Sequence, residues 1–336
     1  MDTRAEMPEA QTDSPNQKNM LKYRNMKTLE WLTRKKEQTG NLETLKLKEQ
    51  WNSQIKILSK LGILEIFPDS KTLGIRGVDG KEYPAPKPDE IQARLEAKKE
   101  MILEKMEQGF TKIIIEPFGY SFDALSEKYK KALLKHHKDG KLLATKEKSA
   151  DPDEILDLNE NEPLWRWEDG YNKCDTEDKI VYFPKEFSSN HGGKTKKELL
   201  ASDVSSGWNI WLVEDMPNIP REGKGKEIGK RKQLETNKEP KEYLKLLQTK
   251  NEYKNESGLT PEADIMYALT HLEETNQVIN DYSGKGSISY QIGAYFPSSG
   301  DVPDSDWDRG YRQALLNRYY PASRGSKYGV RSGVRV

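Results

Sequence analysis

The side chains best suited to recognising another molecule are concentrated near the C-terminus, from Asp304 onwards. Tyrosine, arginine, serine and aspartate are interleaved there without the period of a helix or a strand. Tyrosine offers a large contact area at a small entropic cost, arginine offers forked polar contacts, and serine adapts its hydrogen bonds. We therefore expect a ligand-binding surface, for which the candidate residues are Asp306, Asp308, Arg309, Tyr311, Arg312, Arg318, Tyr320, Ser323, Arg324, Ser326 and Tyr328.

Apolar residues interrupt this polar series, and we expect them to form the buried scaffold that holds the surface in place. Exposed side chains on such a scaffold can be exchanged at little cost in stability. Composition alone favours equally a solvated loop followed by an edge strand. The expected scaffold residues are Trp307, Leu315, Leu316, Val330 and Val334.

Thiol and metal chemistry have few candidate residues in this chain. Cys174 is the one cysteine, which excludes an internal disulfide and a cysteine-rich zinc site. The four histidines lack the spacing of metal ligands, and the acidic residues lack the spacing of an EF-hand loop. We expect no cofactor and no metal, although a calcium site built from separate loops stays open because carboxylates are abundant.

The glycine- and lysine-rich segment 218–239 is predicted to be an exposed insertion. Gly223, Gly225 and Gly229 lack the spacing of a dinucleotide-binding fingerprint. Aromatic residues do not alternate with the basic ones, so we do not expect nucleic acid as a partner. Lysine plus arginine and aspartate plus glutamate each number 55, and the resulting net charge of zero gives no general attraction to polyanions.

Hydropathy and the start of the chain bear on its location. No stretch approaches the roughly 18 apolar residues that a membrane-spanning helix needs, so we expect no membrane span. The first residues are polar and do not resemble a signal peptide. The cytoplasm is the default expectation, and no motif identifies a compartment.

The N-terminal half is predicted to be a polar, disordered tail over residues 1–19, followed by a mainly helical domain over residues 20–150. Residues 135–157 are predicted to be the linker to the next domain. The elements expected before it are helices over Met20–Leu64, from Pro88 and over Ser121–Leu134, a hairpin of Ile63–Phe67 with Thr72–Ile75, and a strand over Lys112–Ile115.

Residues 158–336 are predicted to form a second domain, which makes the chain α+β. Five of the seven tryptophans lie in this half, glycine, serine and tyrosine become more frequent, and long helical stripes become scarce. The elements expected are strands over Ile180–Phe183, Trp208–Val213, Ser287–Phe296 and Tyr328–Val336, with helices over Pro240–Leu247 and Thr260–Asn280.

The C-terminal sequence YGVRSGVRV resembles the closing strand of domains with the C-type-lectin fold. The spacing of Trp307, Gly310, Ala314–Leu316 and Arg331 is similar to that of the variable proteins of diversity-generating retroelements. The resemblance is closest over residues 304–336 and looser over 158–336. It implies a C-type-lectin-type domain behind the helical one, with scattered C-terminal positions rewritten by adenine-directed mutagenesis on a fixed scaffold.

The same resemblance implies that the chain binds a macromolecular ligand, expected to be a protein, and is not an enzyme. Two alternatives stay open. Formylglycine-generating enzymes have this fold but use a cysteine pair, so an enzyme of that type with only Cys174 would have lost or changed its chemistry. The other alternative is a structural component of a phage-like particle.

Overall fold

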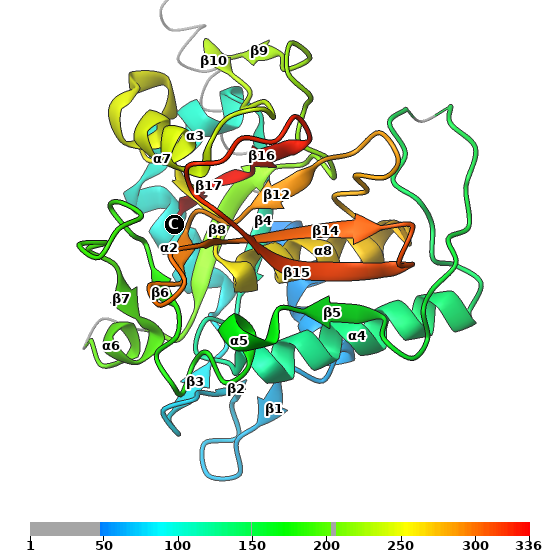
Figure 1. The fold of residues 1–336 in the computed structure, drawn as a ribbon. Helices are drawn as coiled ribbons and strands as arrows, with labels where there is room; N and C mark the ends of the chain where they lie inside the picture. The colour runs from blue at the N-terminus through cyan, green and yellow to red at the C-terminus, as the bar shows by residue number, and fades with distance from the viewer. Residues whose placement is uncertain (1–47, 149, 203–205) are drawn as a thin grey trace, which may run out of the picture. The chain divides into compact units, whose positions relative to one another are not determined.

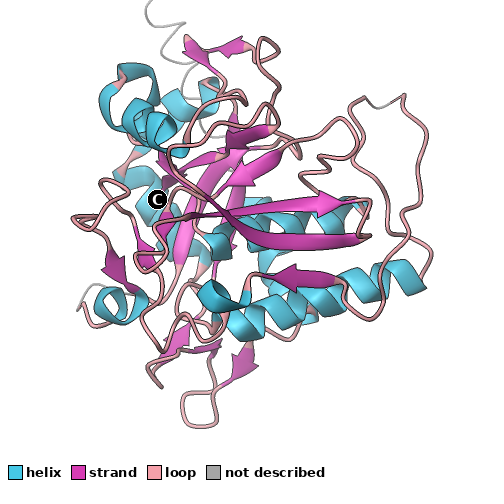
Figure 2. Ribbon diagram, viewed as in Figure 1, coloured by secondary structure: helices cyan, strands magenta, loops and turns pink. Residues whose placement is uncertain are grey.

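A computed structural model of the chain describes residues 48–148, 150–202 and 206–336. The predicted tail and most of the helix predicted over residues 20–64 lie outside the described residues. The described part mixes helices and strands, which agrees with an α+β fold (Figure 2). Residues Leu47–Val336 form one compact unit.

The first described segment contains helices and a small antiparallel sheet. Residues 48–60 are helical. The predicted hairpin is confirmed, since β1 (Glu65–Ile66) pairs with β2 (Leu73–Arg76), and β2 also pairs with β3 (Glu82–Pro84). The helix predicted from Pro88 is confirmed as α2 (Pro88–Ala97), which begins with a proline because the first turn needs no N–H from it. It is followed by α3 (Lys99–Glu107).

A four-stranded antiparallel sheet forms the centre of the unit. Its strands, in order, are β11 (Ser257–Gly258), β17 (Ser332–Arg335), β8 (Asn209–Glu214) and β4 (Phe110–Glu116). Helix α8 (Pro261–Thr275) packs against β4, and all its residues up to Leu272 are buried. The Thr260 hydroxyl caps this helix by accepting the N–H of Ala263, as its sequence predicts.

A five-stranded sheet carries most of the C-terminal sequence (Figure 1). Its strands, in order, are β16 (Tyr328–Val330), β12 (Ile288–Tyr290), β14 (Val302–Asp308), β15 (Gln313–Tyr319) and β5 (Leu164–Arg166). The hairpin β14–β15 is antiparallel, and β15 runs parallel to β5. Helix α8 and helix α4 (Phe122–Lys138) contact this sheet, and the Ser121 hydroxyl caps α4 by accepting the N–H of Ala124.

The remaining elements are short and connect the two larger sheets. A three-stranded sheet and a two-stranded hairpin are present, with three helices and one 3₁₀ turn. Their bounds are β6 (Val181–Tyr182), β7 (Lys194–Thr195), β13 (Ala294–Tyr295), β9 (Glu227–Ile228), β10 (Arg231–Lys232), α5 (Glu168–Tyr171), α6 (Lys196–Leu200), α7 (Pro240–Thr249) and the 3₁₀ turn Asn251–Tyr253.

The central sheet joins strands from both predicted domains, residues 20–150 and residues 158–336. Strand β4, from the predicted helical domain, pairs along its length with β8. One apolar core includes side chains from Trp51 to Val334. The predicted linker contributes Leu142 and Leu156 to that core. The change in composition near residue 155 therefore does not coincide with a break in packing.

Three segments differ from their predicted structure. The strand predicted over Tyr328–Val336 is two strands, because the chain crosses from one sheet to the other at Arg331, whose buried guanidinium binds Asp264. The hairpin β14–β15 lies where no regular element was predicted. The segment 218–239 is not wholly exposed, since Arg231 is fully buried and bound by both oxygens of Glu256.

Candidate ligand-binding surface

The candidate residues lie along the hairpin β14–β15 and the loop that follows it. The exposed ones fall into two groups, with Tyr311 and Arg312 at the tip of the hairpin and the others at or beyond its opposite end. Seven paired residues, or about 20 Å of strand, separate the groups. The exposed candidates are Tyr311 (67%), Tyr320 (60%), Arg312, Arg318, Arg324 and Ser326, while Arg309, Ser323 and Tyr328 are half-buried.

The expected scaffold residues are buried with one exception. Trp307 and Leu316 belong to the main apolar core, together with Val334, and Val330 belongs to a second core that also contains Tyr290 and Val302. Leu315 is half-buried because it alternates with Leu316 and therefore lies on the other face of β15.

The tip of the hairpin is a fixed turn. The Asp308 carboxylate accepts the N–H groups of Gly310 (2.7 Å) and Tyr311 (3.0 Å), and Arg312 has a left-handed φ of 56°. Arg309 is held by both oxygens of Asp281, so it is anchored within the protein. The backbone at Tyr311 is thus held in one conformation, while its ring stays exposed.

Two aspartates predicted to contact a ligand are buried in the structure. Asp308 is buried because it closes the turn and accepts the hydroxyl of Tyr282 at 2.8 Å. Asp306 is 6% exposed and lies on the same face of β14 as Asp304 and Asp308. Neither carboxylate is therefore displayed in the manner the sequence predicted.

Strand alternation decides which face each side chain of β14 occupies. Ser305 donates its hydroxyl to Asp264 on α8, and Trp307 lies in the main core, so these two define the inner face. Asp304, Asp306 and Asp308 occupy the opposite, outer face. The sequence signal for this row is the alternation Asp-x-Asp-x-Asp, of which the predicted surface residues include Asp306 and Asp308 but not Asp304.

Tyrosine rings cover part of this outer face. Tyr290 of β12 lies opposite Asp304 in register. The Tyr319 and Tyr328 rings are 4.4 Å apart between centroids, although they start from strands separated by β12 and β14. Their rings must therefore meet above those two strands, close to Tyr290, whose centroid is 5.3 Å and 5.1 Å from theirs. We call Tyr290, Tyr319 and Tyr328 the tyrosine cover.

Asp304 and Asp306 lie on the covered face without a partner. Among the residues that the structure describes, none forms a hydrogen bond or ion pair with either carboxylate, and one oxygen of each is fully buried. Burial raises the pKa of Asp304 to about 8, with a further contribution from Asp301. Burial, with Asp304 and Asp308 nearby, raises the pKa of Asp306 well above its usual value.

The far end of the surface combines anchored and free groups. The Arg318 guanidinium lies 4.2 Å from the Trp167 ring centroid and pairs with Asp301. Arg324 pairs with Glu242 of α7 at 3.2 Å. Tyr320 has no such anchor in the described part of the chain and is largely exposed. This end of the hairpin therefore exposes one aromatic side chain, Tyr320, and two arginine side chains, Arg318 and Arg324, to a ligand.

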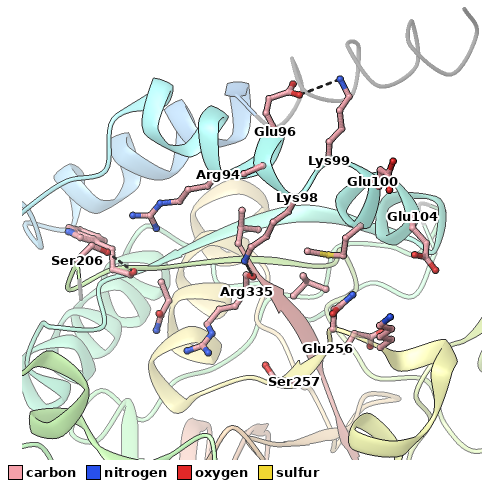
Figure 3. A pocket seen from close by; sticks show the side chains of 18 of the residues that line it. Arg94, Glu96, Lys98, Lys99, Glu100, Glu104, Ser206, Glu256, Ser257 and Arg335 are labelled. Carbon is pink, nitrogen blue, oxygen red and sulfur yellow. Dashed lines mark hydrogen bonds and ion pairs between the residues drawn. The ribbon is translucent and has the colours of Figure 1, made fainter. Parts of the chain in front are cut away.

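A separate cleft of about 1160 Å³ lies between α2 and α3 on one side and residues of β8, β11 and β17 of the central sheet on the other (Figure 3). Its wall carries charges of both signs, including the Glu96–Lys99 ion pair at 3.3 Å. Lys98 donates to the carbonyl of Arg335, and the Arg335 guanidinium lies 3.9 Å from the Phe183 ring centroid. The mixed charge does not select one class of ligand.

A buried polar cluster lies beneath the central sheet. Lys196 pairs with Asp175 (2.5 Å) and with Glu262 (2.8 Å), and Tyr182 donates to Glu262. Burial and the neighbouring Glu262 raise the pKa of Glu116 to about 7. These groups are fully or almost fully buried and do not line the cleft beside α3, so their arrangement fits a structural role.

Three further observations limit the chemistry available. Burial raises the pKa of the Cys174 thiol well above its usual value, which disfavours the reactive thiolate. Within the described ranges, no group of three or more histidine, cysteine, aspartate or glutamate side chains is placed to hold a metal ion. No helix in those ranges is long and apolar enough to cross a bilayer.

Comparisons of the chain with models of known protein families, with curated proteins and with solved structures give no match.

Proposed function

We propose that this chain is a ligand-binding protein, not an enzyme, and that the hairpin β14–β15 presents its recognition surface to a protein ligand. The supporting observation is that two large aromatic side chains, Tyr311 and Tyr320, are more than half exposed at opposite ends of a hairpin whose inner face packs into the core through Trp307 and Leu316. Exposed aromatic side chains on a rigid backbone are the groups that dominate protein interfaces.

The proposal includes a C-type-lectin-type fold with exchangeable surface positions. The last strand, β17, pairs with β8 and β11 inside the central sheet, as a closing strand would. Tyr311 and Arg312 follow a turn fixed by Asp308, so their side chains can change while the turn persists. This division between fixed and exchangeable residues is what a diversified surface requires.

The enzymatic alternative is less well supported. The buried thiol of Cys174 lacks both a second cysteine and access to solvent. One carboxyl group with a pKa near neutrality, Glu116, is enclosed by Trp211, Asn209 and Thr260, which all donate hydrogen bonds to it. A substrate would have no route to either group without unpacking the core.

Selection of random peptides displayed on phage against the purified chain tests the proposal. We expect selected peptides to bind the chain and to lose at least about tenfold in affinity for the triple variant Tyr311→Ala, Arg312→Ala, Tyr320→Ala, since aromatic and arginine anchors each contribute about 1–3 kcal/mol. The matched control is Lys98→Ala, Lys99→Ala, Glu100→Ala, which changes an equally exposed part of the cleft wall.

Three outcomes would contradict the proposal. If selected peptides bind the hairpin variant with unchanged affinity but bind the cleft variant more weakly, the recognition surface is the cleft and not the hairpin. No selected peptide at all would argue against recognition of a protein ligand. Loss of thermal stability in the hairpin variant would mean that its side chains belong to the fold.

A further inference from the structure

The strongest unexplained feature is the pair of partnerless carboxylates on the outer face of β14. Asp304 and Asp306 are 2% and 6% exposed, and neither has a hydrogen-bond or ion-pair partner in the described part of the chain. A buried ionised carboxylate without a partner is strongly unfavourable, so proteins normally pair it, neutralise it or use it to hold a ligand. Two of them, two residues apart on one strand face, are unusual for a purely structural element.

The surroundings of this pair favour a cationic group. Tyr290 is opposite Asp304, and Tyr319 and Tyr328 meet above it. The faces of aromatic rings attract cations, most strongly where water is excluded. Tyr282 lies near the tip end of the same row, with its hydroxyl on Asp308. Carboxyl groups on a strand and aromatic rings beside them are two kinds of group that can bind an organic cation together.

A metal ion does not fit this arrangement. No set of three acidic, histidine or cysteine side chains converges here or elsewhere in the described ranges. Divalent calcium needs six to eight oxygen ligands, and tyrosine ring faces supply none. The cation that fits carries its charge on nitrogen and presents a flat or apolar surface to the rings.

We propose that the outer face of β14 receives the guanidinium of an arginine side chain from the protein ligand, held by Asp304 and Asp306 and enclosed by Tyr319 and Tyr328. This inference rests on the proposed function, because the same hairpin would carry both contacts. A planar guanidinium stacks on aromatic rings and binds carboxylates through two parallel hydrogen bonds, whereas an ammonium does neither as well.

Entry is through the tyrosine cover. Tyr319 and Tyr328 are half-buried side chains at the border of the second core, so their outer edges contact solvent. Their separation uncovers Asp304, and Asp306 lies beside it on the half-buried side of the sheet next to Leu315. Leu315 and Trp165 continue this face as apolar surface for the stem of an arginine.

The test is titration of the full chain with N-acetyl-arginine amide, followed by ligand-observed saturation-transfer NMR. We expect saturable binding, and at least a tenfold weaker affinity in the double variant Asp304→Asn, Asp306→Asn. Asparagine has the shape of the protonated acid, so this variant is expected to fold, which its thermal melt will check. The control Glu100→Gln, Glu104→Gln removes two charges from the exposed side of α3 and is expected to leave the affinity unchanged.

The remaining outcomes overturn the inference. Absence of saturable binding, equal binding by N-acetyl-alanine amide, or loss of affinity in the α3 control would each do so. N-acetyl-lysine amide that binds as tightly as the arginine probe would overturn the choice of guanidinium. Phage-selected peptides that need Tyr311 but tolerate the double asparagine variant would overturn this inference and leave the proposed function standing.

Discussion

Asp304 makes the stability of the protein depend on pH. Its pKa is raised by burial from 3.8 to about 8, so the folded chain keeps a proton that the unfolded chain releases near pH 4. The folded state then binds more protons between about pH 4 and 8, and the free energy of unfolding falls as pH rises through this window. The pKa of Glu116 is shifted in the same direction.

Asp304→Asn should remove this contribution. We expect the variant to match the parent near pH 4 and to be more stable near pH 8 by up to about 5 kcal/mol, since one pKa unit corresponds to about 1.4 kcal/mol. Urea denaturation at the two pH values measures the difference. A variant that is less stable than the parent near pH 8 would mean that the ionised carboxylate has a stabilising partner.

Arg331 shows how one residue fixes the course of the chain between two sheets. Its guanidinium binds the Asp264 carboxylate at 3.2 Å and the carbonyl of Met216 at 2.9 Å, and lies 4.4 Å from the Tyr267 ring centroid. Arg331→Met should destabilise the protein by about 3–5 kcal/mol, because it leaves a buried carboxylate unpaired. Arg312→Met, at an exposed ion pair, is the control and should change stability by less than about 1 kcal/mol. Thermal melts of the two variants measure the difference, and equal melting temperatures would contradict the role given to Arg331.

At the scale of the element, the hairpin β14–β15 should separate stability from recognition. Trp307→Ala removes a ring that is 1% exposed, and we expect a loss of about 3–5 kcal/mol. Tyr311→Ala and Tyr320→Ala should each change the unfolding free energy by no more than about 0.5 kcal/mol. Denaturant melts of the three variants test the division. Comparable losses in all of them would make the hairpin ordinary core.

The elements with strong local signals were predictable from sequence. Ser121 and Thr260 cap helices because their hydroxyls accept N–H groups in the first turn, and this depends on neighbours in sequence alone. Strand β4 was predicted from its run of isoleucines. The exposure of Tyr311 and the burial of Trp307 also followed the interleaving of polar and apolar residues.

The candidate site was predictable only in part, because its strands have polar residues on both faces. Asp304, Asp306 and Asp308 alternate with Ser305 and Trp307, so no apolar face marks β14 as a strand. Asp304 is buried opposite Tyr290, near which the rings of Tyr319 and Tyr328 meet, whereas Asp308 is buried because it closes the turn. Contacts of this kind depend on the arrangement of the sheet and leave no periodic signal in the sequence.

At the scale of the whole molecule, the composition suggests two domains while the central sheet combines both halves. Strand β4 pairs with β8 over its length, and its residues Ile113, Ile114 and Ile115 are almost fully buried. Each buried isoleucine contributes roughly 1.5–3 kcal/mol that the C-terminal half alone would lack. Without β4, strand β8 would also become an unprotected sheet edge, which promotes aggregation.

Fragments divided at the predicted boundary would test this directly. We expect residues 158–336, expressed alone, to aggregate or to unfold without a cooperative transition in circular dichroism. Residues 47–336 are the matched comparison and should melt cooperatively, since they contain every strand of the central sheet. Co-expression of 47–157 with 158–336 should restore the transition, because it returns β4 to β8. A cooperative melt of 158–336 alone would instead mean that the C-terminal half is an independent domain and that β4 adds to a sheet already stable without it.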